Sequence, residues 1–412
     1  MQNNNRCFIY LWDKLVGEMI LVDNEIYFKY DNNFKIEISP LELPIGKTQY
    51  SFNHSKYQHQ HCVAGVFADS LPDSFGMKII ENYFLKEDSR FIPNVIDKLL
   101  FVGDVSLGAL RYQPSIDALT KENIPLKLKD MKLHKKNILN KNSYNSIREA
   151  IDMYKSFSPA GGAKQKMILS WDKKTNTFYT RKAKTNEISL ILKIDESEIP
   201  NDAREAITEY VYSLTAKECG IDIPKTYLLK DEDNYTHFAI ERFDIDENKE
   251  RLHIHTLSGL LNLEKSTRID YIDVMNIAKQ YLKLSHIDIV ELYRRMIFNY
   301  MYNNCDDHLK NTSFIMDKNG IWKLSPAYDL TYNNRIGQRD MMLTINQKLS
   351  TDVTVIDFKD IALKFNIDNY QDIIQRVEKS LDFFKLQLNN YMDDRFKYDK
   401  LELLSVNYVF DV

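Results

Sequence analysis

The sequence predicts an α+β fold of two lobes, in which a strand-rich first part is followed by a helical second part. Short apolar runs separated by polar or glycine-containing turns dominate the first 243 residues, as expected of strands. Beyond residue 255, apolar residues recur every three to four positions, as in amphipathic helices. With 412 residues, 44% of them hydrophobic, the chain is long enough for two or three domains or lobes with a sizeable core.

Residues 1–116 are expected to form a first, β-rich domain. Its predicted strands are residues 7–12, 18–22 and 26–30. Farther along, we interpret residues 69–76 as the start of a helix. The glycine-punctuated stretch 102–110 is interpreted as a hairpin.

Residues 117–142 carry many lysines and few large apolar side chains, so we interpret them as a linker, with a basic recognition patch as the alternative. Residues 143–244 are expected to form a strand-rich lobe that contains a helix near 202–218. Residues 245–412 are expected to form a helical lobe. Its predicted elements are helices at 270–284, 291–303, 357–364 and 368–389, and a hairpin with strands 313–316 and 321–324.

A polar heptapeptide between a predicted helix and this hairpin carries the strongest functional signal. It holds Asp306 and Asn311 five positions apart, and Asp329 follows eighteen residues later. ATP-dependent phosphoryl transfer needs these three groups. One carboxylate accepts the proton of the attacking hydroxyl, while an amide oxygen and a second carboxylate hold Mg²⁺. Protein-kinase catalytic loops use the same Asp-to-Asn offset, so the layout predicts a two-lobed kinase.

Two other interpretations of this segment stay open. It can be a solvated polar loop with an ordinary capping aspartate. Alternatively, Cys305, Asp306, Asp307 and His308 can be ligands of a metal hydrolase. The hydrolase interpretation lacks an H-E-x-x-H motif or a second histidine cluster that would complete a zinc site.

Lys193 lies in an almost continuous apolar run, 188–194, which is typical of a strand buried on both faces. A lysine in such a run costs stability unless it is paired or bound to an anion. We therefore expect Lys193 to hold the α- and β-phosphates of ATP, with Glu209 or Glu205 as its ion-pair partner. The alternative is an edge strand whose lysine points to water.

The Gly161–Gly162 pair, the only Gly-Gly in the chain, precedes a predicted strand at 167–171. Glycines there let backbone N–H groups approach anionic oxygens, and Lys164 and Lys166 add positive charge. We interpret the segment as a phosphate-binding loop, although it is not a Walker A sequence. A plain turn is the alternative.

Residues 237–244 are interpreted as a strand that leads into the connection between the lobes. Backbone groups there could bind adenine, and Asp244 could hydrogen-bond the ribose.

Composition argues against several classes of function. The net charge of −4 gives no reason to expect direct binding to DNA or RNA. The four cysteines form no C-x-x-C pair and are typical of reduced thiols in a cytosolic protein. The N-terminus does not resemble a signal peptide, and no apolar run reaches the length of a membrane span. We therefore expect a cytoplasmic protein without membrane contact.

Taken in order, these motifs resemble those of the HipA family, the kinase toxins of bacterial toxin–antitoxin pairs. The resemblance runs over nearly the whole chain. Its motifs are Ser70-Leu71-Pro72-Asp73, Gly108-Ala109-Leu110, Gly161-Gly162-Ala163-Lys164-Gln165-Lys166, Lys193, Glu241-Arg242-Phe243-Asp244, Asn304-Cys305-Asp306-Asp307-His308-Leu309-Lys310-Asn311 and Pro326-Ala327-Tyr328-Asp329. It implies a fold related to protein and phosphoinositide kinases, with an extra N-terminal β-rich subdomain and a helical C-lobe.

The resemblance also implies roles for the matching residues. Asp306 would be the catalytic base, and Asn311 and Asp329 would be the Mg²⁺ ligands. Lys193 would bind phosphate, and Glu241, Phe243 and Asp244 would contact adenine and ribose. The ATP-binding set would comprise Gly161, Gly162, Ala163, Lys164, Gln165, Lys166, Lys193, Glu241, Arg242, Phe243, Asp244, His308 and Asn311.

Members of this family phosphorylate serine on aminoacyl-tRNA synthetases, and a small helix-turn-helix antitoxin restrains them. The resemblance therefore implies a protein substrate, an antitoxin partner, and contact with DNA only through that antitoxin. Family members also phosphorylate a serine of their own phosphate loop, which disables ATP binding. Where many members carry that serine this chain has Pro159, so Ser158, or else Ser156, is the expected site of self-modification.

Two further functions stay open. A kinase of the same fold could act on a small molecule or a lipid, because the catalytic loop specifies phosphoryl transfer and not the acceptor. A nucleotide-binding regulator without turnover is the third interpretation. The intact Lys193, Asp306, Asn311 and Asp329 argue against it, since a pseudokinase commonly loses at least one such residue.

Overall fold

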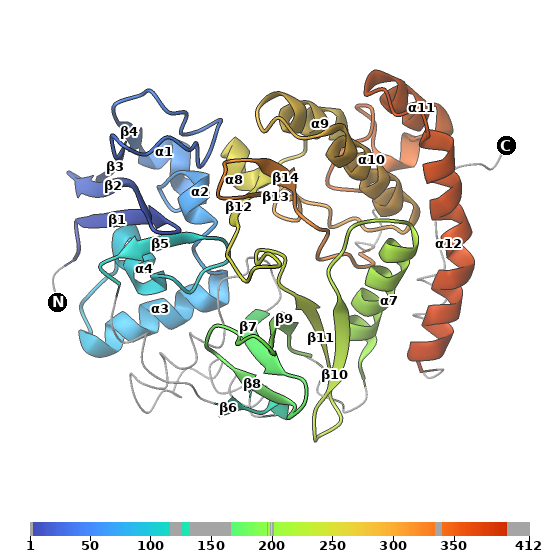
Figure 1. The fold of residues 1–412 in the computed structure, drawn as a ribbon, viewed down its shortest axis with the longest axis horizontal. Helices are drawn as coiled ribbons and strands as arrows, with labels where there is room; N and C mark the ends of the chain where they lie inside the picture. Colours follow the sequence, from blue (N-terminus) through green and yellow to red (C-terminus); the bar gives the residue numbers. More distant parts are fainter. Residues whose placement is uncertain are drawn as a thin grey trace.

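A computed structural model of the chain describes residues 3–115, 125–129, 131, 166–195, 197, 199, 202–333 and 340–393. Within these ranges the strands form three sheets of five, six and three strands, and neighbouring strands pair antiparallel throughout. The long helices lie mainly toward the C-terminal end of the chain (Figure 1). The predicted α+β fold class is confirmed.

The first sheet belongs to the N-terminal domain and has the strand order β4-β3-β2-β1-β5. Its strands are β1 (Arg6–Leu11), β2 (Lys14–Val22), β3 (Glu25–Tyr30), β4 (Tyr50–Phe52) and β5 (Leu110–Gln113). Alternate side chains of β1, those of Cys7, Ile9 and Leu11, are buried in the core. The helices of this domain are α1 (His54–Tyr57), α2 (Gly65–Ala68), α3 (Ser74–Glu87) and α4 (Val95–Val102).

The hairpin predicted at residues 102–110 is wrong. Helix α4 occupies the residues up to Val102 and begins at a capping box formed by Asn94 and Asp97. Gly103 and Gly108 both have positive φ, 58° and 77°, so they do lie at turns of the chain. The strand that follows, β5, pairs with β1 near the N-terminus rather than with a neighbouring segment.

The second sheet has the order β10-β11-β9-β7-β8-β6. Its strands are β6 (Pro125–Leu126), β7 (Lys166–Asp172), β8 (Thr177–Tyr179), β9 (Ile188–Lys193), β10 (Thr226–Lys230) and β11 (Thr236–Glu241). Lys166 and Lys193 are cross-strand partners in β7 and β9, so their side chains leave the same face of the sheet. The predicted helix near 202–218 is confirmed as α7 (Arg204–Glu218), which packs against β10 and β11.

The C-terminal lobe contains the predicted helices and the predicted hairpin. Its elements are α8 (Leu257–Leu261), α9 (Tyr271–Gln280), α10 (His286–Met301), α11 (Val355–Lys364), α12 (Tyr370–Tyr391), β12 (His253–Thr256), β13 (Ser313–Met316) and β14 (Trp322–Leu324). Helix α10 begins earlier than predicted because Ser285 and Asp288 form a capping box. Tyr212, Phe298 and Phe384 meet edge-on, which joins α7, α10 and α12.

The N-terminal domain docks on the C-terminal lobe where α2 meets α8 (Figure 1). At this contact a Cβ on Gly65 would lie 2.2 Å from the carbonyl oxygen of Gly259, so only glycine fits at position 65. Nearby, Trp12 Nε1 donates a hydrogen bond to the carbonyl of Arg251 at 2.6 Å. Among the described residues, none of the helices has the length and apolarity that crossing a membrane would require.

Candidate active site

The predicted catalytic loop follows helix α10 directly. Asn303 takes a left-handed φ of 50°, which turns the chain out of the helix. The side-chain Nδ2 of Asn311 then donates to the backbone carbonyl of Asp306 at 2.7 Å. Since its Nδ2 is the donor in this bond, Asn311 keeps its amide oxygen as an acceptor. Asp306 itself is partly exposed.

The neighbouring Asp307 anchors this loop. Its buried carboxylate accepts hydrogen bonds from the hydroxyl of Tyr271 at 2.9 Å and from the backbone N–H of Met342 at 2.7 Å and Leu343 at 3.3 Å. Burial raises the pKa of Asp307 to about 7, although these hydrogen bonds oppose the rise. With its oxygens held by three donors, Asp307 is less available to a substrate than Asp306.

Asp329 pairs with two buried lysines of the site. Its carboxylate forms ion pairs with Lys166, at 2.6 Å, and with Lys193, which also pairs with Glu209 of α7. Burial opposes the charge of Asp329, but the two ammonium groups outweigh it and hold the pKa of Asp329 well below its usual range. Asp329 has a φ of 56°, a strained conformation for a residue other than glycine that is frequent at functional sites.

Lys193 is buried on β9, as its apolar run predicts, and it is paired rather than free. Burial opposes its charge, but Asp329 and Glu209 more than compensate, so the pKa of Lys193 is raised. Of the two glutamates considered as partners in the sequence, Glu209 is the one in contact. Two lysines from neighbouring strands thus face two carboxylates inside the cavity.

This cavity is lined by residues of the N-terminal domain, of the second sheet with α7, and of the C-terminal lobe. Phe243 and Tyr328 stack with ring centroids 5.0 Å apart at an angle of 11°, and Ile191 and Ile240 add apolar surface. The remaining lining residues are Ala68, Asp69, Leu71, Leu107, Lys166, Lys193, Glu209, Ile254, Thr256, Lys310, Ser313 and Asp329. An apolar end beside a charged end suits the base and the phosphates of a nucleotide.

Among the predicted nucleotide contacts that the structure describes, five lie outside this lining: Glu241, Arg242, Asp244, His308 and Asn311. Asp244 is 1% exposed, pairs with Arg242 at 2.6 Å, and accepts a hydrogen bond from the N–H of Gly108 at 2.8 Å. Burial opposes its charge, but the guanidinium of Arg242 outweighs it and keeps the pKa of Asp244 low. Glu241 accepts a hydrogen bond from the hydroxyl of Tyr227 at 2.6 Å. The structure therefore does not bring the Asp244 carboxylate into the cavity.

His308 is buried in the catalytic loop, and its Nδ1 has no hydrogen-bond partner among the described residues. Burial lowers the pKa of His308, which favours the neutral imidazole, although the nearby Asp306 opposes that shift. Gly161, Gly162, Ala163, Lys164, Gln165 and Ser158 lie outside the described residues, and Lys166 is the part of the predicted phosphate loop that lies within them.

Several lining residues were not predicted from the sequence as site residues. Tyr328 and Lys310 adjoin predicted residues within the motifs, so their position in the chain was an available signal. Asp69 directly precedes the Ser70-Leu71-Pro72-Asp73 motif, but only the docking of the N-terminal domain brings its side chain to the cavity. Thr256 ends β12 in the C-terminal lobe, and no sequence motif marked it.

The donors present fit magnesium and a triphosphate. The amide of Asn311 and the carboxylate of Asp329 line one small cavity beside the catalytic loop, and oxygen donors of this kind suit Mg²⁺. No group of three or more His, Cys, Asp or Glu side chains suited to a metal occurs in the described parts of the chain. A site with few protein ligands is typical of Mg²⁺ that is bound largely by nucleotide phosphates.

Comparisons with known proteins support the same fold. A complex from Shewanella oneidensis MR-1, described as toxin–antitoxin system HipA, HipB and operator DNA, contains a chain similar to this one, with a TM-score of 0.69 at 14% identity. The match covers 97% of this chain and 95% of that chain. The Helicobacter pylori proinflammatory kinase CtkA matches with a TM-score of only 0.39 at 14% identity, over 58% of this chain and 88% of that one, which is too weak to support a conclusion.

A curated protein of Haemophilus influenzae, named as a candidate kinase, is 35% identical over 152 residues. This match covers 34% of the present chain and 43% of the relative, so it spans less than half of that protein's length. Residues 8–113 match the family described as HipA N-terminal domain, and residues 158–382 match the one described as HipA-like C-terminal domain. These two matches, in the expected order and over most of the sequence, show that the chain belongs to the HipA family.

Proposed function

We propose that this protein is an ATP- and Mg²⁺-dependent kinase that transfers the γ-phosphoryl group to serine or threonine of a protein. The observation that carries the proposal is the position of Asp329, which two lysines from the sheet hold on one side while Asn311 of the catalytic loop lines a cavity with it on the other. The lysines that would bind phosphates thus lie beside the oxygen donors that would bind a metal, as the Mg²⁺ complex of a nucleotide requires.

Each residue has a definite task in this proposal. The Asp306 carboxylate accepts the proton of the acceptor hydroxyl, because it is the partly exposed carboxylate of the loop. Lys166 and Lys193, which contact Asp329 here, would bind the phosphate oxygens of the nucleotide. Asn311 and Asp329 would hold Mg²⁺, which would supply positive charge to the phosphates. Phe243 and Tyr328 provide the apolar surface for adenine.

We further propose that the kinase acts as the toxin of a toxin–antitoxin pair. Membership of the HipA family and the likeness to the chain from the Shewanella complex support this part. The expected partner is a small helix-turn-helix antitoxin, through which DNA would be contacted. The expected substrate is a component of translation such as an aminoacyl-tRNA synthetase.

The deciding experiment incubates the purified chain with γ-labelled ATP, Mg²⁺ and a bacterial lysate, followed by mass spectrometry of the labelled material. A labelled serine or threonine on a protein that Asp306→Asn fails to label supports the proposal. Label only in a lipid or small-molecule fraction would assign the fold to another acceptor. Complete absence of label, with nucleotide bound, would favour a regulator without turnover.

We also propose Ser158 as the site of self-modification, because a phosphate there places about two negative charges beside Gly161–Gly162. Pro159 restricts Ser158 to extended backbone conformations. Phosphopeptide mapping after incubation with Mg²⁺-ATP should find phosphate on Ser158, with Ser156 as the alternative site. A chain that labels a substrate while staying unmodified over 150–170 would show that this form of self-inhibition has been lost.

A further inference from the structure

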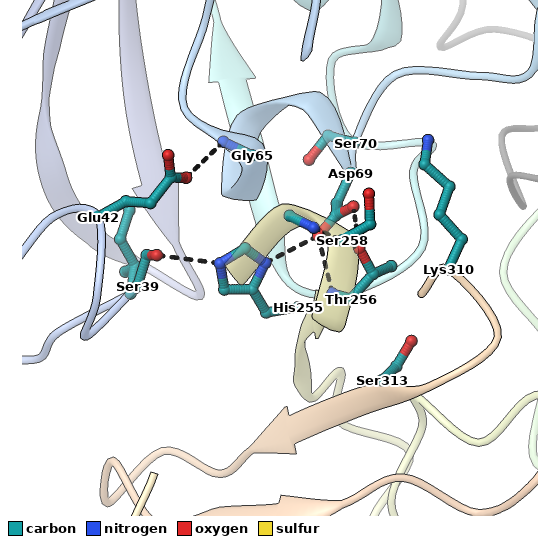
Figure 2. Close-up of polar contacts among 12 residues, drawn as sticks. Ser39, Glu42, Gly65, Asp69, Ser70, His255, Thr256, Ser258, Lys310 and Ser313 are labelled. Atoms are coloured by element: carbon teal, nitrogen blue, oxygen red, sulfur yellow. Dashed lines mark hydrogen bonds and ion pairs between the residues drawn. The ribbon is translucent and has the colours of Figure 1, made fainter. Parts of the chain in front are cut away.

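Asp69 of the N-terminal domain reaches across the domain contact into the C-terminal lobe (Figure 2). It follows α2, and its carboxylate accepts hydrogen bonds from the backbone N–H and the hydroxyl of Thr256, each at 2.8 Å. His255 Nδ1 lies 2.8 Å from the same carboxylate, and His255 Nε2 lies 3.0 Å from the hydroxyl of Ser39. Because an ionised carboxylate only accepts, Nδ1 of His255 carries a proton.

Thr256 in turn holds the start of α8. Its hydroxyl oxygen accepts a hydrogen bond from the N–H of Gly259 at 2.9 Å, which makes Thr256 the N-cap residue of the helix. A single hydroxyl therefore donates to Asp69 and accepts from α8. A change of the Thr256 χ1 rotamer that broke the contact with Asp69 would also move this oxygen away from the N–H of Gly259.

The first turn of α8 is hydrogen-bonded to the catalytic loop. The N–H of Leu257 donates to the carbonyl of Thr312 at 2.8 Å, and the N–H of Ser258 donates to the carbonyl of Leu309 at 3.1 Å. These two carbonyls lie on either side of Lys310 and Asn311. The backbone that carries the proposed magnesium ligand is thus fixed at both ends by the element that Asp69 holds.

The carboxylate of Asp69 is packed so closely against α8 that neighbouring groups cannot replace its contacts. A Cβ on Gly259 would lie 2.5 Å from Asp69 Oδ2 and 2.9 Å from His255 Cε1, so the carboxylate is packed directly against the helix. Burial opposes the charge of Asp69, but the hydrogen bond and charge of His255, and then the charge of Lys310, keep its pKa low. Asp69, Thr256 and Lys310 also line the cavity that contains Lys193 and Asp329.

Ser39, His255 and Asp69 have the order of contacts found in a serine-hydrolase triad, but their surroundings rule out that chemistry. Ser39 and His255 are both fully buried, whereas an attacking hydroxyl must be reachable by a substrate. The carboxylate of Asp69 is committed to Thr256 as well as to the imidazole. The arrangement is suited to fixing groups in place and not to nucleophilic attack.

We propose that Asp69 is a positioning residue for phosphoryl transfer, which acts through Thr256 and the start of α8 on the Leu309–Thr312 part of the catalytic loop. This inference rests on the proposed kinase function. Asp69 is the C-cap residue of α2, so the end of this helix delivers its carboxylate to the other lobe. The N-terminal domain then contributes to catalysis, because its Asp69 helps to position the catalytic loop.

The test compares Asp69→Asn with Asp73→Asn in the full-length chain. Asp73 is the matched control, because its Oδ1 accepts a hydrogen bond from the N–H of Gly76 at 2.9 Å near the start of α3, and asparagine caps a helix about as well as aspartate. Initial rates of label transfer from γ-labelled ATP, with Mg²⁺, to the protein substrate identified in the lysate experiment give kcat and the KM for ATP. For Asp69→Asn, kcat should fall on the order of 10- to 100-fold while the KM stays near the wild-type value. Asp73→Asn should leave both unchanged.

Hydrogen exchange followed by mass spectrometry gives a readout that does not depend on activity. In Asp69→Asn the amides of Leu257 and Ser258 should exchange faster than in the wild-type chain, and in Asp73→Asn they should not. If Asp69→Asn does not fold, Thr256→Val removes the hydroxyl contact with little change in volume and should shift kcat and exchange in the same direction.

Faster exchange with unchanged kcat would make Asp69 a purely structural residue and overturn the proposal. Unchanged exchange at Leu257 and Ser258 would overturn it as well. A wild-type chain that transfers no phosphate would count against the proposed function instead, and the exchange measurement then decides by itself whether Asp69 holds the loop.

Discussion

Asp329 is the residue that connects the buried ion pairs of the site. Its carboxylate is shared by Lys166 and Lys193, and Lys193 is shared in turn with Glu209. Removing one member of a buried ion pair typically costs about 3–5 kcal/mol, because the remaining charge stays buried without a partner. Substitutions here therefore change stability as well as ligand binding, and variants that keep the side-chain volume give the clearest result.

The first prediction concerns Asp306. Asp306→Asn removes the proton acceptor without changing side-chain size, so phosphoryl transfer should fall by about 10²- to 10³-fold or more, with an unchanged unfolding midpoint. Labelling with γ-labelled ATP and thermal unfolding provide the two measurements. Asp317→Asn, in the turn of the β13–β14 hairpin, is a control that should remain active. A near wild-type rate for Asp306→Asn would transfer the role of base to Asp307.

The second prediction concerns the metal and phosphate contacts. Asp329→Asn should abolish the gain in ATP affinity that Mg²⁺ provides, because an amide does not neutralise the metal as a carboxylate does. Lys193→Met should weaken ATP binding whether or not Mg²⁺ is present, since it removes a charge that pairs with phosphate. Calorimetry with and without Mg²⁺ separates the two effects. Equal Mg²⁺-ATP affinity in Asp329→Asn and the wild-type chain would contradict the metal role.

At the scale of elements, β12 connects the two halves of the molecule. It pairs with β13 of the C-terminal lobe, while the buried His253 on β12 places its Nε2 2.9 Å from the carbonyl of Ile38 in the N-terminal domain. Its Nδ1 has no hydrogen-bond partner among the described residues. A proton added to this imidazole would place an unpaired charge in the domain contact.

The third prediction follows from this burial. Burial, with a smaller contribution from the nearby His255, lowers the pKa of His253 to about 4, while the carbonyl of Ile38 and the charge of Asp69 act in the opposite direction. The unfolded chain has the ordinary histidine value of about 6.5, so it binds the proton first as the pH falls. The contribution of His253 to stability is thus fully present above pH 6.5 and is lost toward pH 4.

The corresponding loss between pH 7 and pH 4.5 is about 2 kcal/mol of unfolding free energy. Denaturant unfolding of the wild-type chain and of His253→Gln at both pH values measures this loss. Between pH 7 and pH 4.5 the unfolding free energy of His253→Gln should fall by about 2 kcal/mol less than that of the wild-type chain. His286→Gln, at an exposed position, is the control and should follow the wild-type chain. The same pH dependence in all three proteins would remove His253 as the cause.

At the scale of the whole molecule, the cavity needs all three regions. The sheet supplies Lys166 and Lys193, the C-terminal lobe supplies Asp329 and Lys310 of the proposed catalytic loop, and the N-terminal domain supplies Asp69 together with Leu71 and Leu107. The contact of Gly65 with Gly259 fixes the N-terminal domain against the catalytic lobe. Removal of the N-terminal domain should therefore disturb the cavity as well as the fold.

The fourth prediction tests the toxin proposal on the whole protein. Expression of the wild-type chain should arrest the growth of a bacterial host, and Asp306→Asn at the same protein level should relieve the arrest. Growth curves with quantified expression provide the measurement. Arrest by both forms would show that any toxicity is independent of kinase activity.

Local signals were sufficient for α7 and for most elements of the C-terminal lobe. The β13–β14 hairpin and helices α7, α9, α11 and α12 match the predicted segments, since periodicity and turn residues lie within each element. The hairpin predicted at 102–110 failed because the partner of β5 is distant in sequence. Strand pairing over such distances leaves no local pattern to read.

The sequence by itself determined the family motifs, the α+β class and the residue types of a phosphoryl-transfer site, because these depend on spacing along the chain. Only the tertiary structure decided which groups meet. It selected Glu209 as the partner of Lys193, turned Asp244 toward Arg242 and Gly108, and brought Asp69 to Thr256. Ion pairs and hydrogen bonds act over a few ångströms, so their partners are fixed by packing between distant segments and not by their order in the sequence.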